Sequence, residues 1–344
     1  MIKNLHLILI WGINVLMLQH FLDFTGKLSL LLFLSGLMIW FRFRKNIIIT
    51  IVPPVMLLGM LTWFSTIQAS NDREWRADVS VLPKIDINNE TVTIQNLRNA
   101  IWNNPKVFSP NWETRNYNLN KLRSLDLIVE PFNDSKLMAH TMLSFGFEDQ
   151  GNVIVSVEAR REMQEEYSLV AGALRQFELI YIFGDEKDLL TLRALVRGSA
   201  LHLYPIKAEP EFIVTLFKDL ANSANALHDK PQFYRTLRDN CTSTLVEHID
   251  RHYQQKIGWR AETIFPAKAG ELLHKLDRMD TQLSYNQAYQ ASRIDHIVRE
   301  LRKEEQANLP EAVPTDIMVS EGRYRDMSFS LELHARSSMA YAKQ

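Results

Sequence analysis

The sequence predicts an α+β protein in which three N-terminal transmembrane helices precede a domain made of a small antiparallel sheet, further helices and a C-terminal helical tail. Three observations support this prediction. Residues 5–68 are almost entirely apolar, segments with strand-like alternation lie between residues 79 and 204, and segments with helical spacing follow from residue 210. A run of strands followed by a run of helices is typical of the α+β class.

The apolar N-terminal region contains three segments that are long enough to cross a membrane. A helix needs about 20 apolar residues to cross a hydrocarbon core, and residues 5–22, 24–41 and 46–68 meet that requirement. Backbone that faces lipid must satisfy its own hydrogen bonds, so we expect these segments to be helical. This pattern predicts a multi-pass protein of a bacterial inner membrane.

Basic residues in the short loops predict the orientation. Lys3 precedes the first segment, and Arg42, Arg44 and Lys45 follow the second, so the positive-inside rule places both ends of this helix pair in the cytoplasm. Three crossings then put the following domain in the periplasm. Two crossings would put it in the cytoplasm. Cleavage of the first segment as a signal peptide is disfavoured because a small-residue cleavage site is missing.

Composition excludes several classes of function. Of the 39 basic and 40 acidic residues, five basic and one acidic lie within residues 1–69, which leaves the rest of the chain with a net charge of about −5. No basic patch dominates, so a nucleic-acid partner is not expected. The sequence also lacks the glycine-rich and HExxH motifs of nucleotide and zinc sites, and we expect no cofactor and no metal.

The chain is expected to comprise a transmembrane anchor at residues 1–69, a periplasmic domain at 70–260, and a helical extension at 261–344 that ends as a loose tail beyond Glu304. Alternation and turn residues predict the strands, and helical spacing predicts the helices. Residues 96–123 are rich in polar residues and are expected to be irregular. The expected strands are 79–82, 91–94, 139–147, 152–160, 177–183 and 200–204, and the expected helices are 210–228, 242–255, 270–279 and 286–303.

Cys241 is the single cysteine and the central candidate for a nucleophile. It lies at the start of a predicted helix, between Asn240 and Thr242. The unpaired N–H groups and the positive dipole end of a helix N-terminus stabilise a thiolate and can donate to an oxyanion. The alternative is that Cys241 is a small buried apolar residue, as lone cysteines usually are.

A thiol nucleophile needs an imidazole as general base, and His140 opens one strand of the predicted hairpin. With a three-residue loop at 149–151, the numbers of paired residues sum to about 300. In that register Glu158 lies diagonal to His140 and can orient its ring, although a one-residue slip would move Glu158 to the other face.

Other histidines offer weaker alternatives. His202, which also lies on a predicted strand, is the second candidate for the base. His248 and His252 have the i, i+4 spacing of a metal pair on a helix, but no third ligand with suitable spacing lies nearby. Helix rise places His248 roughly 10 Å from Cys241, which is too far for a direct hydrogen bond.

Four separated blocks of sequence resemble one family, the Lnb-type N-terminal periplasmic domain. The blocks are AHTMLSFGF, VSVEARRE, RQFELIYIFGDEKDLLTLR and KPQFYRTLRDNCTSTL. The resemblance covers the chain from Trp75 to Val246 and continues more faintly to Arg299. This family is related to circularly permuted papain-like thiol enzymes, in which the histidine strand precedes the cysteine helix, so the resemblance implies a permuted papain-like domain.

The resemblance also implies roles for individual residues. Cys241 would be the nucleophile, His140 the general base and Glu158 the orienting group, with Asn240 and Thr242 supporting the oxyanion. Family members of the Lnb type are associated with N-acylation of lipoproteins, using a phospholipid as acyl donor. In this chain the apolar segments precede the periplasmic domain instead of following it, which leaves the substrate open.

Three functions are therefore compatible with the sequence. The first is a membrane-anchored periplasmic acyltransferase that works through an acyl-thioester on a membrane lipid or lipoprotein substrate. The second is a cysteine peptidase or amidase of the cell envelope, with water as the acceptor. The third is a non-catalytic envelope scaffold, which would place the thiol and the imidazole more than about 8 Å apart, beyond the reach that general-base catalysis needs.

Overall fold

The computed structural model of this chain describes residues 61–104, 107–236, 240–253, 255–258, 260–307 and 318–344. Six isolated positions of the N-terminal region are also described, namely Gly12, Ile13, Gly36, Val55, Leu58 and Gly59. The chain divides into two compact units, Met1–Ala69 and Ser70–Gln344.

The expected three-helix membrane anchor is corrected by the structure. Among the residues that are described, no helix is both long and apolar enough to cross a membrane. The longest described helical run of the Met1–Ala69 unit is 61–66, which rises about 9 Å at about 1.5 Å per residue, against a hydrocarbon core of about 30 Å. The remainder of the expected segments 5–22, 24–41 and 46–68 lies largely outside the described residues.

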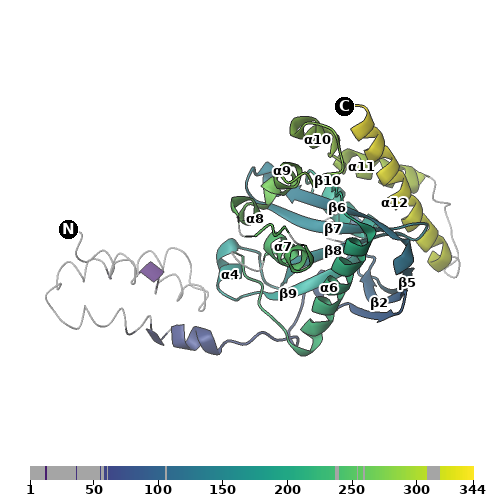
Figure 1. The fold of residues 1–344 in the computed structure, drawn as a ribbon. Coiled ribbons are helices and arrows are strands. Elements are labelled where there is room, and N and C mark those ends of the chain that lie inside the picture. Colours follow the sequence, from purple (N-terminus) through teal and green to yellow (C-terminus); the bar gives the residue numbers. More distant parts are fainter. Residues whose placement is uncertain are drawn as a thin grey trace. The chain divides into compact units, whose positions relative to one another are not determined.

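An eight-stranded sheet forms the centre of the Ser70–Gln344 unit (Figure 1). The strand order is β1-β2-β9-β8-β7-β6-β10, with β5 also paired to β2. The pair β2–β9 is parallel and the other neighbours are antiparallel. The expected small antiparallel sheet is therefore larger than predicted and mixed. The strands are β1 Lys84–Asn88, β2 Thr91–Arg98, β5 Trp112–Asn118, β6 Leu122–Pro131, β7 Ala139–Phe147, β8 Gly151–Arg160, β9 Glu178–Asp185 and β10 His202–Pro205, and a separate pair is formed by β3 Ile101–Asn104 and β4 Val107–Ser109.

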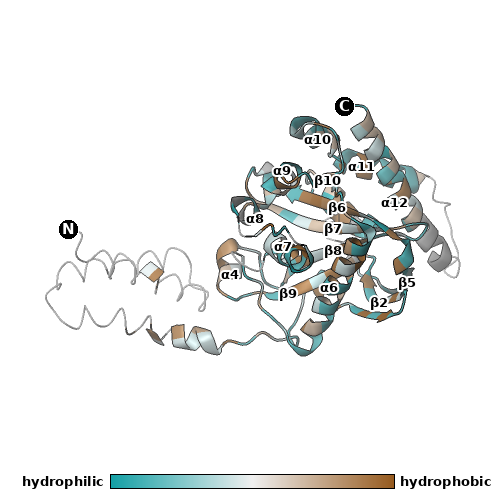
Figure 2. Ribbon diagram, viewed as in Figure 1, coloured by the Kyte–Doolittle hydropathy of each residue, from teal (hydrophilic) through white to brown (hydrophobic). Residues whose placement is uncertain are grey.

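The central strands are buried on both faces, which explains their long apolar runs. Every residue of β7 and of β9 is buried. Leu143 and Phe145 of β7 belong to the core on one face, whereas Met142 belongs to the core on the other. Towards the edge, β2 alternates between apolar and polar residues, and this banding is visible in Figure 2. The central strands β7 and β8 carry the candidate residues His140 and Glu158.

The helices cover the two faces differently. The amphipathic helix α6 packs Leu216, Phe217 and Leu220 onto the first face, as its helical spacing predicts. Residues of α5, α11 and α12 contribute to the core on the second face. The helices are α4 Leu169–Ala173, α5 Glu186–Thr191, α6 Pro210–Asp229, α7 Cys241–His252, α8 Ala261–Ile264, α9 Ala269–Lys275, α10 Tyr285–Ala291, α11 Asp295–Ala307 and α12 Met318–Ala342, and a π-helical turn at Leu192–Val196 follows α5.

The strand expected at 79–82 is not formed, and the helix expected at 286–303 is divided into α10 and α11. Two expectations about irregular segments are also wrong. Residues 96–123 were expected to be irregular, but they contain β3, β4, β5 and the start of β6. The loose tail expected beyond Glu304 is replaced over its last part by α12, which buries Phe329 and Leu333 in the second core. In both segments polar residues form buried ion pairs, so low apolar content was a poor guide to order.

Helix α12 is fixed to the sheet by charged groups as well as by apolar ones. Asp326 accepts from Arg115 at 2.7 Å and from Lys187 at 2.7 Å. His334 Nε2 lies 3.0 Å from Glu186 Oε1, and His334 Nδ1 lies 3.8 Å from Asp126 Oδ2. Burial alone would lower the pKa of His334, but the two carboxylates outweigh it and raise the pKa to about 9.

We expect His334→Gln to destabilise the protein in a pH-dependent manner. Because the folded-state pKa of His334 is about 9 and the unfolded value is about 6.5, the stabilisation is complete below pH 6.5 and is lost as pH rises through 9. The shift corresponds to a loss on the order of 3 kcal/mol in the free energy of unfolding at pH 6. Urea denaturation at pH 6 and pH 10 measures this, with His296→Gln at an exposed position as control. A deficit that is equal at both pH values would contradict the ion pair.

Candidate active site

Helix α7 begins at Cys241 because Asn240 caps it. The Oδ1 atom of Asn240 accepts hydrogen bonds from the N–H groups of Thr242 at 2.9 Å and Ser243 at 2.8 Å. The hydroxyl of Ser243 in turn accepts from the N–H group of Asn240 at 3.0 Å. This reciprocal arrangement is a capping box, and it holds the thiol on the first residue of the helix.

We expect Asn240→Ala to lower the free energy of unfolding by about 1 kcal/mol, the usual effect of removing an N-cap side chain. Asn240→Asp keeps an acceptor oxygen at the cap and is expected to remain close to the wild type. Urea denaturation at pH 7 compares the three proteins. Equal stability of the alanine variant and the wild type would show that the cap does not hold α7.

The start of α7 is held against β7, the strand that carries His140. Thr242 Oγ1 and Thr141 Oγ1 lie 2.9 Å apart, and Cys241 Sγ lies 3.9 Å from the carbonyl oxygen of Ala139. Cys241 is only 4 % exposed. The contacts bring the thiol, which is 101 residues away from His140 in the chain, next to the strand that carries the imidazole.

The imidazole of His140 lines the same pocket as the thiol and lowers its pKa. Burial would raise the pKa of Cys241, but the charge and the hydrogen bond of His140, together with hydrogen bonds from Thr141, lower it to about 7 from an ordinary value of 9. A thiol with this pKa is about half ionised at neutral pH, and the thiolate is the nucleophilic form. The structure thus places the two principal candidates in the wall of one pocket, where the imidazole acts on the thiol electrostatically.

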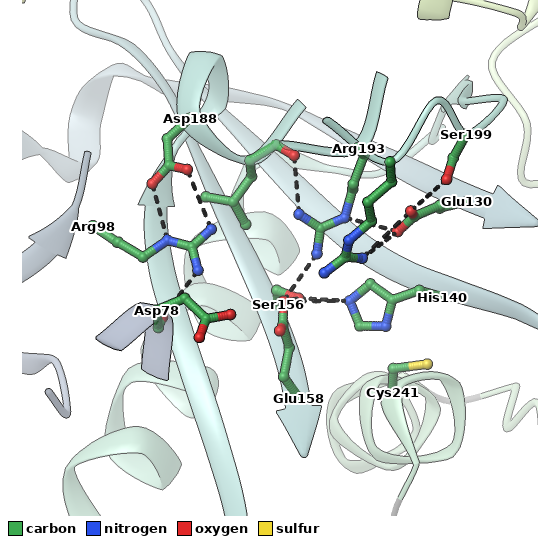
Figure 3. A network of polar contacts seen from close by, with 12 residues as sticks. Asp78, Arg98, Glu130, His140, Ser156, Glu158, Asp188, Arg193, Ser199 and Cys241 are labelled. Carbon is green, nitrogen blue, oxygen red and sulfur yellow. Dashed lines mark hydrogen bonds and ion pairs between the residues drawn. The ribbon is translucent and has the colours of Figure 1, made fainter. Parts of the chain in front are cut away.

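The second ring nitrogen of His140 is oriented by a chain of polar groups (Figure 3). His140 Nε2 lies 2.7 Å from Ser156 Oγ, which donates to Glu158 Oε1 at 2.8 Å. Glu158 Oε1 lies 3.7 Å from His140 Nε2. Glu158 therefore acts on the imidazole mainly through Ser156, and the remaining ring nitrogen lies on the side of Cys241.

The hairpin register differs from the expected one by two residues. The pairs between β7 and β8 run from Phe147 with Gly151 to Met142 with Ser156. The hairpin loop is therefore Glu148-Asp149-Gln150. Paired numbers therefore sum to 298, not to about 300. A shift of two keeps every side chain on its face, and continuing this register brings Glu158 opposite His140 instead of diagonal to it.

Arg193 of the π-helical turn binds Glu158, the last group of this series of hydrogen bonds, and also a second carboxylate, Glu130. Its guanidinium lies 2.9 Å from Glu158 Oε1 and 3.0 Å from Glu130 Oε2, and it donates to the carbonyl of Leu189 at 2.9 Å. Burial would raise the pKa of Glu158, but Arg193 and then His140 outweigh it and hold that pKa well below its usual range. Glu158 is therefore a stable carboxylate at the end of the chain of polar groups.

A pocket of about 280 Å³ lies over the thiol and the imidazole. One part of its wall is apolar, and another part carries arginine guanidinium groups. The thiol is therefore accessible to a substrate although the cysteine is largely buried. The apolar part of the wall includes Phe132, Met138, Val157 and Pro266. The basic part includes Arg161 and Arg197.

Comparison with known families agrees with the resemblance seen in the sequence. Residues 108–269 match the family model of the Lnb N-terminal periplasmic domain. This segment is similar to the Lnb N-terminal periplasmic domain. The matched segment includes His140, Glu158 and Cys241, and the family description supports a periplasmic location for this domain. No curated protein and no solved structure matches the chain, so the permuted papain-like relationship stays a prediction.

The two residues predicted to support an oxyanion are at the site, but their polar groups are already engaged. The N–H group of Thr242 donates to the Asn240 side chain, whose Nδ2 donates to the carbonyl of Thr236 at 2.9 Å. The geometry gives Asn240 and Thr242 positioning contacts, and their oxyanion role stays a prediction.

The other candidate histidines lie outside the pocket that contains Cys241. His202 Nδ1 binds the hydroxyl of Ser292 at 2.8 Å, and its burial lowers the pKa to about 4. His248 lies between Tyr181, at 2.8 Å, and Asp219, at 2.8 Å, and His252 also lies 3.1 Å from Asp219. Within the described ranges, no group of three or more such side chains could hold a metal ion.

Ser156 and Arg193 were missed by reasoning from the sequence. Ser156 precedes Glu158 by two positions and so shares its face of β8, a signal that the correct hairpin register would have revealed. Arg193 carries no comparable signal, because its partners Glu130 and Glu158 lie on two other strands and meet it only in the folded chain.

Proposed function

We propose that this domain is a periplasmic thiol acyltransferase that works through an acyl-thioester on Cys241. The observation that carries the proposal is that Cys241 and His140 line one pocket, with His140 Nε2 held by Ser156 and with the thiol pKa lowered to about 7. That geometry favours catalysis over the scaffold alternative, because a structural thiol in an apolar setting would have a raised pKa.

In the proposed first step, the Cys241 thiolate attacks the carbonyl carbon of an ester in the acyl donor. The carbon–sulfur bond forms, the ester carbon–oxygen bond breaks, and the departing alcohol takes its proton from the protonated His140 ring. In the second step an amine attacks the thioester, and His140 takes the proton that the amine releases. The thiolate leaves, and the acyl group ends as an amide.

Ser156, Glu158 and Arg193 would keep the imidazole in one orientation through both steps. The anionic Glu158 holds Ser156, which binds His140 Nε2 and leaves the other ring nitrogen for the thiol. The same carboxylate stabilises the ring when it carries the second proton. These are positioning residues, since none of them contacts the reacting carbonyl in the proposed steps.

The apolar part of the pocket supports an acyl chain as the transferred group. Phe132, Met138 and Val157 line the pocket near the thiol together with Pro266. An alkyl chain that leaves water for such a wall contributes about 0.8 kcal/mol for each buried CH₂ group. We therefore propose a lipid or lipoprotein substrate. The alternative function is an amidase or peptidase that uses the same residues on a peptide.

Acyl-enzyme formation tests the proposal. The purified full-length chain is incubated with p-nitrophenyl octanoate and followed by intact-protein mass spectrometry. We expect one octanoyl adduct on the wild type that neutral hydroxylamine removes, and none on Cys241→Ala. Addition of an α-amino peptide should then convert the adduct into an octanoyl amide.

The outcomes separate the three functions. Transfer to the peptide amine supports the acyltransferase. Release of free octanoate at the same rate with and without the peptide supports the hydrolase instead. Absence of any Cys241 adduct, with the protein folded by circular dichroism, would support the scaffold.

A further inference from the structure

Arg161 occupies a distinctive position in the pocket over the thiol. It directly follows β8, the strand that carries Ser156 and Glu158, and it lines the same pocket as Cys241 and His140. Its backbone is fixed, because its carbonyl oxygen accepts from the N–H group of Arg76 at 3.0 Å. Arg161 therefore contributes a cationic side chain to the lining of this pocket.

The three arginines that line this pocket have unequal partners. Arg193 is bound by Glu130 and Glu158, and Arg197 lies 3.2 Å from Glu130. In the part of the chain that the structure describes, no carboxylate lies within ion-pair distance of Arg161. The three guanidinium groups that line the pocket are thus matched by only two carboxylates, Glu158 in the pocket wall and Glu130 behind it.

The two carboxylates that act most strongly on the charge of Arg161 are each paired with another arginine. Glu158 is bound by Arg193, and Asp78 lies 3.4 Å from Arg76. Half-burial of Arg161 and repulsion from Arg76 and Arg197 disfavour its charge and lower its pKa, yet a guanidinium remains protonated in proteins. A charge that is desolvated without a partner is costly, and an anion entering the pocket would remove that cost.

We propose that Arg161 is the specificity residue of this site and binds an anionic group, a phosphodiester or a carboxylate, of the molecule that reacts with Cys241. A guanidinium offers two parallel N–H donors, which match the paired oxygens of either group. This inference rests on the proposed function for the identity of the reacting molecule. It adds that the molecule is an anion and that its charge lies beside the reacting carbonyl.

Two alkylating reagents of equal chemistry and different charge test this assignment. Iodoacetamide is neutral, and iodoacetate carries a carboxylate next to the same reactive carbon. We expect the ratio of iodoacetate to iodoacetamide rates at Cys241 to exceed the ratio for a free cysteine peptide. In Arg161→Gln that ratio should fall by roughly ten- to a hundredfold, the usual effect of one charge-assisted hydrogen bond.

A matched control removes a positive charge elsewhere. Arg123 is 54 % exposed in its side chain and lies outside the pocket, so Arg123→Gln should keep the wild-type ratio. Protection of Cys241 from iodoacetamide by methyl phosphate or by acetate then identifies which of the two anions the site prefers. An equal fall in the ratio in both variants would indicate a general effect of net charge and would overturn the assignment.

Failure of the proposed function is distinguishable from failure of this inference. The iodoacetamide rate alone, with its dependence on His140, reports on the thiol and not on Arg161. If the thiol proves inert, the thermal midpoint of unfolding still decides. Methyl phosphate or acetate should raise that midpoint for the wild type and for Arg123→Gln but not for Arg161→Gln, and an equal rise in all three proteins would overturn the inference.

Discussion

Alkylation of Cys241 by iodoacetamide is expected to reach half of its maximal rate near pH 7, the pKa to which His140 lowers the thiol. In His140→Ala the charge and the hydrogen bond that stabilise the thiolate are gone, and burial then keeps the pKa at or above the ordinary value of 9. The thiolate fraction at pH 7 would fall from about one half to about one hundredth. We therefore expect a loss in rate of roughly 50-fold at pH 7, measured by mass spectrometry across pH 5 to 10.

His202→Ala is the matched control for this experiment, because His202 was the alternative base and lies outside the pocket. Its pH profile should coincide with that of the wild type, with folding checked by circular dichroism. A wild-type midpoint near pH 9 that does not move in His140→Ala would refute the Cys–His pair. It would also favour the scaffold function over the two enzymatic functions.

Arg193→Leu is expected to cause the largest loss of stability. The side chain of Arg193 is 0 % exposed and that of Glu130 is 1 % exposed, so the variant leaves two carboxylates in the interior without their common partner. Breaking a buried ion pair from one side costs about 3–5 kcal/mol, which urea denaturation at pH 7 would measure. The folded-state pKa values of Glu130 and Glu158 are lowered, so their contribution is present above the unfolded value and is lost as pH falls. The deficit of the variant should accordingly shrink below about pH 4.

Arg197→Leu provides the comparison for Arg193→Leu. Arg197 also binds Glu130, but its side chain is 36 % exposed, and an ion pair of this kind contributes about 0–1 kcal/mol. A deficit below 1 kcal/mol for both variants would contradict the view that Arg193 organises the site.

Much of the region around the candidate site could be predicted from the sequence, because its elements follow simple local patterns. The predicted strand 139–147 is β7, and the strand 152–160 and the helices 210–228 and 242–255 lie close to the observed β8, α6 and α7. Period and turn residues are local properties, and these segments obey them. Cys241 and His140 could be identified from the sequence because each lies near the start of such an element.

What could not be predicted depends on contacts between distant segments. The strand β5 and the helix α12 are polar in sequence, and they are ordered by ion pairs such as Arg115 with Asp326, 211 residues apart. The role of Arg193 depends on three segments meeting. The hairpin register was wrong by two residues because the loop type decides it, and a glycine is compatible with more than one loop. The expected membrane-spanning helices rested on apolar content alone.

The way in which α12 is attached has a consequence for how the domain matures during synthesis. Glu186 lies beneath α12 and is bound by His334, which leaves the ribosome 148 residues later. Until then the second face of the sheet lacks Phe329 and Leu333, and its carboxylates are without their partner. The strands β7 and β8 share that sheet with the thiol chemistry. The nascent domain would therefore expose an incomplete sheet to chaperones until translation has passed residue 334.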